Sequence, residues 1–281
     1  ESHNVAIGHN TAKAITTGLR NTIVGSIAGD ALTDADDNTV FGYNALTSDT
    51  LGSKTVAIGR SVLSSQNFTT ATDSYNTAVG YNAGGQITTG IQNTLIGGLA
   101  GDALTDADFN IAVGLQSLAV DTLGSKSIAI GTFALESQNF TTATDSHNVA
   151  VGHSAGNDIT TGVNSTLIGG LAGDAITTAN NNVAVGKSAL STETSGANCT
   201  AIGSNALAAQ NVGSGTNVAN TAVGYDAGLA VTTGVQNTFV GAYAGDATDD
   251  GDNNTAVGYL ALSANCGDSN TAVGLETLKL T

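Results

Sequence analysis

The sequence is poor in residues that most globular domains use freely. Its 281 residues include no proline, methionine or tryptophan, and only 4% are aromatic and 11% charged. Lysine and arginine number 7 against 23 aspartates and glutamates, so the net charge is −16. This charge disfavours binding to nucleic-acid phosphates or anionic lipid surfaces and favours cations as ionic partners. No apolar run approaches the roughly 18 residues that a membrane helix needs, so we expect no membrane insertion.

Cysteine and methionine usage bears on redox state and processing. The two cysteines, Cys199 and Cys266, fall at different places in the internal repeats described below. The sequence therefore forms no cysteine ladder and leaves the oxidation of the two thiols open. The absence of methionine indicates a processed product or an excised fragment, and an export signal removed earlier is compatible with it.

One pentapeptide, Asn76-Thr77-Ala78-Val79-Gly80, recurs throughout the chain. Successive copies are separated by 17, 17, 17 and 21 residues, a series that repeats every 72 residues, and the final step is 16 residues. We number the motif positions one to five from asparagine to glycine, and we name the four short repeats of each long repeat the first to fourth turns. The motif ends at Gly8, Gly25, Gly42, Gly59, Gly80, Gly97, Gly114, Gly131, Gly152, Gly169, Gly186, Gly203, Gly224, Gly241, Gly258 and Gly274.

A period that spans the whole chain predicts one elongated array, because a turn of about 17 residues cannot bury an apolar face alone. We predict an all-β parallel β-solenoid of about sixteen turns, stacked about 4.8 Å apart. Asparagine at position one predicts a ladder of side-chain amides, and glycine at position five predicts a tight bend. The predicted domain is a single one, 1–281, with long repeats at 4–75, 76–147, 148–219 and 220–281.

The motif alternates in a way that predicts a strand with two faces. Position two is always β-branched and position four is Val or Ile in all copies but one, so we expect this face to point into the core. Position three, usually alanine, is then expected to point outward. Only the second turn has a large side chain at position three. We predict that these side chains contact a neighbouring chain or sheet: Ile23, Leu95, Leu167 and Phe239.

The fourth turn is four residues longer than the others and predicts a protruding loop. Residues 64–74 and their near copy 137–146 carry Phe68 and Phe140, respectively. Two interpretations remain open at this point. The aromatic side chains make lateral or ligand contacts, or each loop is a surface excursion whose aromatic side chain folds back.

Acidic residues gather where the second turn ends, and calcium is the candidate ligand, since clustered carboxylates with nearby carbonyls suit Ca²⁺. The alternative is a solvated acidic edge that prevents lateral aggregation. The third long repeat has Thr177-Thr178-Ala179-Asn180-Asn181 at this place, which argues against an obligatory metal column. The candidate metal ligands are Asp34, Asp36, Asp37, Asp106, Asp108, Asp249, Asp250 and Asp252.

Catalytic signals are weak. The four histidines occupy equivalent places in the first and third long repeats, where the second has tyrosine, so we interpret them as repeat decoration. A glycan-processing enzyme would need a carboxylate cluster in a groove, whereas the acidic residues here lie in repeated turns. We expect no enzymatic activity and no obligatory cofactor. The histidines are His3, His9, His147 and His153.

The two ends of the sequence belong to the same kind of turn. Glu1-Ser2-His3 corresponds to the tail of a fourth turn, and Thr281 falls within another fourth turn before its long loop. We expect successive subunits to stack end to end and continue the ladder into a filament. The alternative is a segment cut from a longer protein.

The motif also resembles known repeats. Asn148-Val149-Ala150-Val151-Gly152 and Ser127-Ile128-Ala129-Ile130-Gly131 resemble the head repeats of trimeric autotransporter adhesins, and the asparagine-initiated copies resemble repeats of phage tail-fibre-like proteins. The adhesin resemblance implies a left-handed, usually trimeric β-roll on an extracellular surface that binds matrix or host partners. The turns here are longer than those of that family, and the chain carries neither a coiled-coil stalk nor a membrane anchor.

These observations predict a non-enzymatic, extracellular or cell-surface structural protein whose main partner is itself, as a fibre or filament subunit with head-to-tail and lateral contacts. The alternative is a receptor-binding segment of an adhesin or phage tail fibre, trimeric and acting through the fourth-turn loops on a host or matrix ligand. We expect no nucleic-acid partner.

Overall fold

The protein is a parallel β-solenoid of about sixteen turns, as the repeat predicts. The computed structural model describes residues 2–213 and 216–279, and these residues contain no helix. The turns group into two compact units, Glu1–Ser146 and His147–Thr281. The single domain expected from the sequence stays a prediction.

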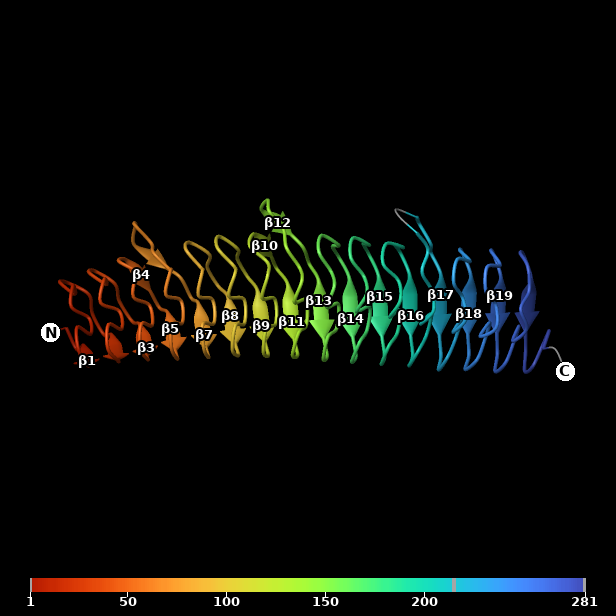
Figure 1. Cartoon of the computed structure of the whole chain (residues 1–281), viewed down its shortest axis with the longest axis horizontal. Helices are drawn as coiled ribbons and strands as arrows, with labels where there is room; N and C mark the ends of the chain where they lie inside the picture. The colour runs from red at the N-terminus through yellow and green to blue at the C-terminus, as the bar shows by residue number, and fades with distance from the viewer. Residues whose placement is uncertain (1, 214–215, 280–281) are drawn as a thin grey trace. The chain divides into compact units, whose positions relative to one another are not determined.

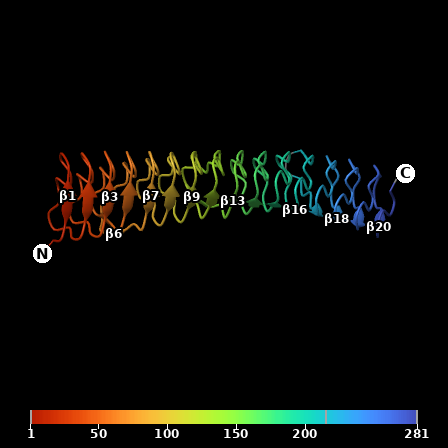
Figure 2. The same ribbon diagram turned by 90° about the horizontal axis from the view of Figure 1, so that it is seen from below.

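The first unit stacks eight three-residue strands, one per turn, all parallel and in sequence order (Figures 1 and 2). The long fourth turns add two short parallel pairs, β4 (Gly52–Ser53) with β6 (Thr72–Asp73) and β10 (Gly124–Ser125) with β12 (Thr144–Asp145). The stacked strands are β1 (Val5–Ile7), β2 (Thr22–Val24), β3 (Thr39–Phe41), β5 (Val56–Ile58), β7 (Thr77–Val79), β8 (Thr94–Ile96), β9 (Ile111–Val113) and β11 (Ile128–Ile130).

The second unit repeats this arrangement. Its strands pair in constant register, so that each motif position lies beside the same position of the next turn. In its fourth-turn loop, the bridge Ala197↔Asn217 stands where the first unit has a two-stranded pair. The strands are β13 (Val149–Val151), β14 (Thr166–Ile168), β15 (Val183–Val185), β16 (Thr200–Ile202), β17 (Thr221–Val223), β18 (Thr238–Val240), β19 (Thr255–Val257) and β20 (Thr271–Val273).

The direction of the strand faces is opposite to the one expected. Position three points inward: Ala78 and Leu95 have no exposed surface, whereas Ile96 at position four is 40% exposed. The interior is narrow, so alanine fills it in most turns, and the β-branched side chains form the outer face. The predicted chain contacts at Ile23, Leu95, Leu167 and Phe239 are therefore wrong, because all four side chains are fully buried in the core.

We continue the motif numbering along each turn, so that Gly80 is position five and Ile87 position twelve. Core volume is balanced between positions three, nine and twelve. In the second long repeat, Gly84 occupies position nine with φ +59°, and a Cβ there would collide with Leu95 and Leu63 from the adjacent turns. Ile87 at position twelve fills the remaining space. In the third and fourth turns of the first three long repeats the pattern reverses: position nine is a buried leucine such as Leu63, and position twelve is polar.

Glycine and asparagine act as predicted, with one refinement. Gly80 has φ +146°, and a Cβ there would collide with the carbonyl oxygen of Gly97 in the next turn. The buried Asn76 accepts a hydrogen bond at Oδ1 from the Asn93 backbone N–H at 2.9 Å, which confirms the amide ladder. The left-handed residue is the one before the asparagine, as at Tyr75 with φ 51°.

Candidate functional site

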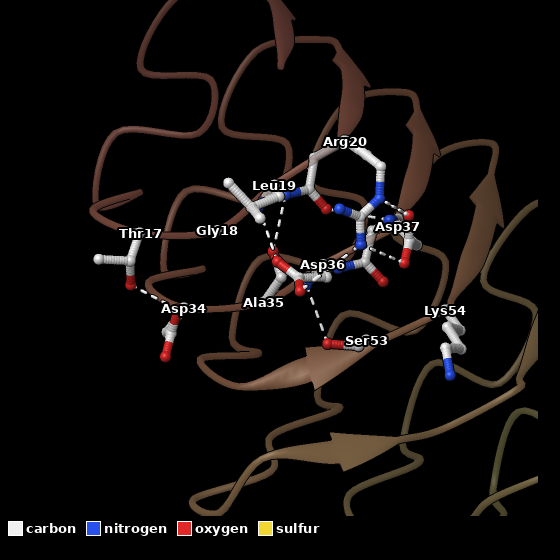
Figure 3. A network of polar contacts seen from close by, with 12 residues as sticks. Thr17, Gly18, Leu19, Arg20, Asp34, Ala35, Asp36, Asp37, Ser53 and Lys54 are labelled. Atoms are coloured by element: carbon white, nitrogen blue, oxygen red, sulfur yellow. Dashed lines mark hydrogen bonds and ion pairs between the residues drawn. The ribbon is translucent and has the colours of Figure 1, made fainter. Parts of the chain in front are cut away.

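The acidic turns hold the backbone of the preceding turn (Figure 3). Asp36 Oδ1 accepts a hydrogen bond from the Leu19 backbone N–H at 2.7 Å, and the Asp36 N–H donates to Ser53 Oγ at 2.9 Å. The same column acts alike in other repeats. Asp108 accepts from the Ile91 N–H at 2.7 Å, and Asp252 accepts from the Val235 N–H at 2.8 Å.

The neighbouring carboxylates each accept hydrogen bonds from a different side chain. The Thr17 hydroxyl donates to Asp34, and Arg20 donates to both oxygens of Asp37 at 2.6 and 2.9 Å (Figure 3). The hydrogen bond from Arg20 holds the pKa of Asp37 below its ordinary value. In later repeats the Asp106 carboxylate accepts from Thr89 at 2.5 Å, the Asp249 carboxylate accepts from Thr232, and Asp250 is exposed.

These carboxylates do not converge on a common point. Within residues 2–213 and 216–279, no group of three or more His, Cys, Asp or Glu side chains is arranged to hold a metal ion. In the third long repeat, Asn180 Oδ1 accepts from the Val163 N–H at 2.8 Å, so a neutral amide replaces the carboxylate. The column supplies a hydrogen-bond acceptor, and calcium binding at this edge stays a prediction without a ligand set.

The fourth-turn loops do not present their aromatic side chains. Phe68 is 5% exposed and Phe140 6%, so the predicted contact role for both is wrong, and each ring folds back against the third turn. Gly52 lies directly beside the Phe68 ring, where a Cβ would collide with it. The Phe68 backbone N–H donates to Asp49 Oδ1 at 3.1 Å, which ties the loop to the third turn.

A buried polar network at the base of each loop escaped the sequence analysis. Asp49 has no exposed surface, and its Oδ2 accepts from Gln66 Nε2 at 2.6 Å. Gln66 Oε1 accepts in turn from Asn76 Nδ2 at 2.9 Å. Burial raises the pKa of Asp49, and the same holds for Asp121 in the next repeat. The available signal was position twelve, which is acidic in the third turn and glutamine in the fourth of three long repeats.

Ion pairs close the outer edges of the first two loops. Lys54 pairs with Asp73, and its Nζ also lies 5.1 Å from the ring centre of Tyr75. Lys126 pairs with Asp145 at 2.5 Å. Both pairs are substantially exposed, so each stabilises the fold only slightly.

The outer side of each unit is a sheet face of β-branched and aliphatic side chains. We name the side chains at positions two and four of the stacked strands the outer strand face. Eight of the position-four members expose roughly two fifths of their surface, and nothing in the described chain covers that part. They include Phe41, Ile58, Ile96 and Ile130 in the first unit and Ile168, Ile202, Val240 and Val257 in the second.

Other candidate sites are less organised. The four histidines are exposed. An open cavity of about 330 Å³ lies beside Cys266 and Leu278, and its lining residues include no carboxylate. No helix of the described residues is long and apolar enough to span a bilayer.

Comparison with known proteins adds no family. No protein-family model matches the chain, and no curated protein matches it.

Proposed function

We propose that the protein is a non-enzymatic structural subunit that associates with copies of itself into an extracellular fibre. The observation that carries this proposal is the outer strand face, whose position-four side chains form an apolar row that continues from turn to turn within each unit. Contiguous apolar surface of this kind marks an interaction site. Because these side chains are already more than half buried, covering the rest of each contributes about 1 kcal/mol, and a stable lateral contact needs many stacked turns.

End-to-end stacking is the second part of the proposal. Each strand of a unit pairs with the next in constant register, as in Thr221↔Thr238 and Thr238↔Thr255. An unpaired parallel strand offers its backbone donors and acceptors to another strand, and a head-to-tail contact that does not close generates a fibre. The charge of −16 limits non-specific association between growing fibres.

The alternative is a receptor-binding segment of an adhesin or tail fibre, trimeric and held together by the same outer strand face. The protrusion of the fourth-turn loops favours it (Figure 1). Thr69 and Thr70 at the tip of the first loop are exposed, whereas the base of the loop is buried. The resemblance of the motif to adhesin head and tail-fibre repeats supports both functions and an extracellular location.

Assembly tests the proposal directly. The wild-type chain should form fibres or lateral oligomers in negative-stain electron microscopy and sedimentation as its concentration rises. Ile58→Lys with Ile96→Lys should abolish lateral association, because each places a charge on the outer strand face. Thr69→Lys with Thr70→Lys makes the same charge change at a loop tip and should leave assembly intact.

The two proposed functions predict different effects of shortening the loop tip. Removing residues 69–71 spares the buried Gln66 and Phe68 and should leave fibres unchanged. If the shortened chain still assembles but loses binding to matrix or host surfaces, the receptor-binding alternative is favoured. A wild-type chain that stays monomeric at high concentration contradicts both.

A further inference from the structure

Three tyrosines from consecutive turns of the second unit are in contact. Tyr225 follows β17, Tyr243 follows β18 and Tyr259 follows β19. The ring centres of Tyr225 and Tyr243 are 5.3 Å apart, and those of Tyr243 and Tyr259 are 5.9 Å apart. Tyr225 and Tyr259 expose about half of their surface (49% and 48%), and Tyr243 is half-buried. The cluster is therefore open to solvent.

The ring orientations distinguish this cluster from a stack. The plane of Tyr243 makes angles of 80° with Tyr225 and 89° with Tyr259. In a stack the faces cover one another, whereas an edge contact leaves part of the ring faces uncovered. Aromatic faces carry partial negative charge, so such an arrangement attracts a cation.

One carboxylate, Asp226, adjoins the tyrosine cluster, and a second, Asp246, lies near Asp226. Asp226 follows Tyr225 directly, is 7% exposed, and accepts a hydrogen bond from Asn205 Nδ2 at 3.0 Å. Asp246 Oδ1 is buried and has no hydrogen-bond partner. Burial raises the pKa of Asp246, and the charge of Asp226 raises it further. The site thus concentrates negative charge that its own side chains do not neutralise.

The surrounding sequence supplies no positive charge. Between Ser188 and Leu278 there is no lysine, arginine or histidine, while the same stretch contains eight aspartates and glutamates. A cation arriving from solution therefore meets no competing side chain from this stretch, and the local field favours its approach.

We propose that Tyr225, Tyr243 and Tyr259, with Asp226 next to Tyr225 and Asp246 near Asp226, bind a methylated ammonium group. Methylated ammonium is weakly hydrated and contacts aromatic faces directly. Calcium and magnesium instead require several oxygen ligands, of which this site offers two carboxylates. A choline headgroup and a trimethyl-lysine side chain both carry the group that the site recognises. The inference is independent of fibre formation.

The other long repeats provide internal controls. The positions of Tyr225, Tyr243 and Tyr259 are occupied in the second repeat by one tyrosine and two leucines, and Asp226 is replaced there by Asn82. The first and third repeats likewise lack three tyrosines. The corresponding residues are Tyr81, Leu99 and Leu115 in the second repeat, His9, Ile27 and Tyr43 in the first, and His153, Leu171 and Lys187 in the third.

Choline chloride is the first probe, titrated into the full chain by calorimetry and by tyrosine fluorescence, which no tryptophan obscures. We expect saturable binding, and no binding of the neutral isostere 3,3-dimethylbutan-1-ol at the same concentrations. Tyr243→Leu, which copies the second repeat, should weaken binding about tenfold or more, whereas Tyr243→Phe should retain it. Tyr81→Leu is the matched control and should have no effect.

Charge and ligand source are tested next. Asp246→Asn keeps the shape of the side chain and should weaken choline binding several-fold. Phosphocholine-bearing vesicles and a trimethyl-lysine peptide then show which source of the group binds more tightly. Circular dichroism and thermal unfolding establish that each variant is folded. The comparison of choline with its neutral isostere uses the wild-type chain and does not depend on any variant.

Three results would overturn the proposal. The first is the absence of saturable choline binding to the wild-type chain. The second is equal affinity for the neutral isostere, which would make the cluster an apolar patch without a preference for cations. The third is an equal loss of binding in Tyr81→Leu and Tyr243→Leu, which would place the binding elsewhere.

Discussion

The fourth-turn loop of the first long repeat and that of the third are built on different contacts. In the first, β4 pairs with β6, Lys54 pairs with Asp73, and Phe68 fills the base. In the third, a bridge stands in place of the paired strands, Asn198 Nδ2 donates to Asn217 Oδ1 at 2.8 Å, and the smaller Val212 replaces the phenylalanine.

One element is common to both loops. A fully buried carboxylate, Asp49 or Glu193, accepts from a glutamine one turn later, at 2.6 and 2.9 Å respectively. The glutamine accepts from the next asparagine, as Gln210 does from Asn220 at 2.8 Å. We infer that this buried network fixes the loop base, while the outer contacts are interchangeable.

The largest predicted effect comes from reversing the polarity of the network. Asp49→Asn places an amide N–H₂ against Gln66 Nε2, so two donors face each other in a buried site. We expect a loss of about 3 kcal/mol in the free energy of unfolding. Adding Gln66→Glu restores a donor–acceptor pair and should recover most of the loss. The measurements are urea unfolding and hydrogen exchange at the Phe68 amide.

The third repeat supplies the matched experiment. Glu193→Gln should destabilise the second unit, and Glu193→Gln with Gln210→Glu should restore it. If the single substitutions prove harmless in both units, the network does not fix the loops and the comparison fails.

Truncation of the buried aromatic side chain is expected to cost about as much. Phe68→Ala removes a side chain that is 5% exposed and leaves a cavity at the loop base, so we expect a cost of about 3 kcal/mol. Val212→Ala removes fewer buried atoms and should cost clearly less. Thermal unfolding of both variants measures the difference. Equal costs would show that the loop base collapses around either cavity.

Much of this fold was predictable from the period alone. The spacing of the motif gave the number of turns, the place of each strand, the glycine bend and the asparagine ladder. The direction of the strand faces was not predictable from hydrophobicity, because alanine inside and valine outside reverse the usual ranking. A size signal was present: the bulky Leu95 at position three is accompanied by glycine at position nine of its own turn, Gly101, and of the preceding turn, Gly84. A large side chain at position three is offset by glycine at position nine, which indicates that both positions point into the same core.

The candidate sites were predictable to a smaller degree. The acidic turns were visible, but whether carboxylates converge or act singly depends on side-chain geometry that spacing does not encode. The tyrosine cluster combines position six of two turns with position seven of the turn between them, so no single column reveals it. The buried Asp49 was overlooked because a lone acidic residue in a turn suggests solvent exposure.

A smaller effect is expected in the pKa values, which should differ between buried and ion-paired carboxylates. Burial raises the pKa of Asp49 and Asp121 above the ordinary value, and Arg20 lowers that of Asp37. The two buried groups stabilise the fold fully below the unfolded-state pKa of about 4, and that contribution is lost as pH rises through their folded-state pKa. Carboxyl-carbon NMR titration should therefore give midpoints for Asp49 and Asp121 above that of Asp37. The reverse order would show that the hydrogen bonds to Asp49 outweigh its burial.

The smallest effect is expected at the outer ion pair. Lys54 has φ 60°, a left-handed conformation that asparagine adopts more readily, and Asn198 holds the equivalent place with φ 63°. Lys54→Asn loses an exposed, salt-screened ion pair but relieves backbone strain, so the unfolding temperature at physiological salt should hardly change. Lys54→Ala loses the pair without that relief and should be the less stable variant. Hydrogen exchange at the Ser74 amide, which donates to the Ser53 carbonyl at 2.9 Å, reports on the loop base. Fast exchange in Lys54→Asn would mean that the ion pair, and not the buried carboxylate, holds the first loop in place.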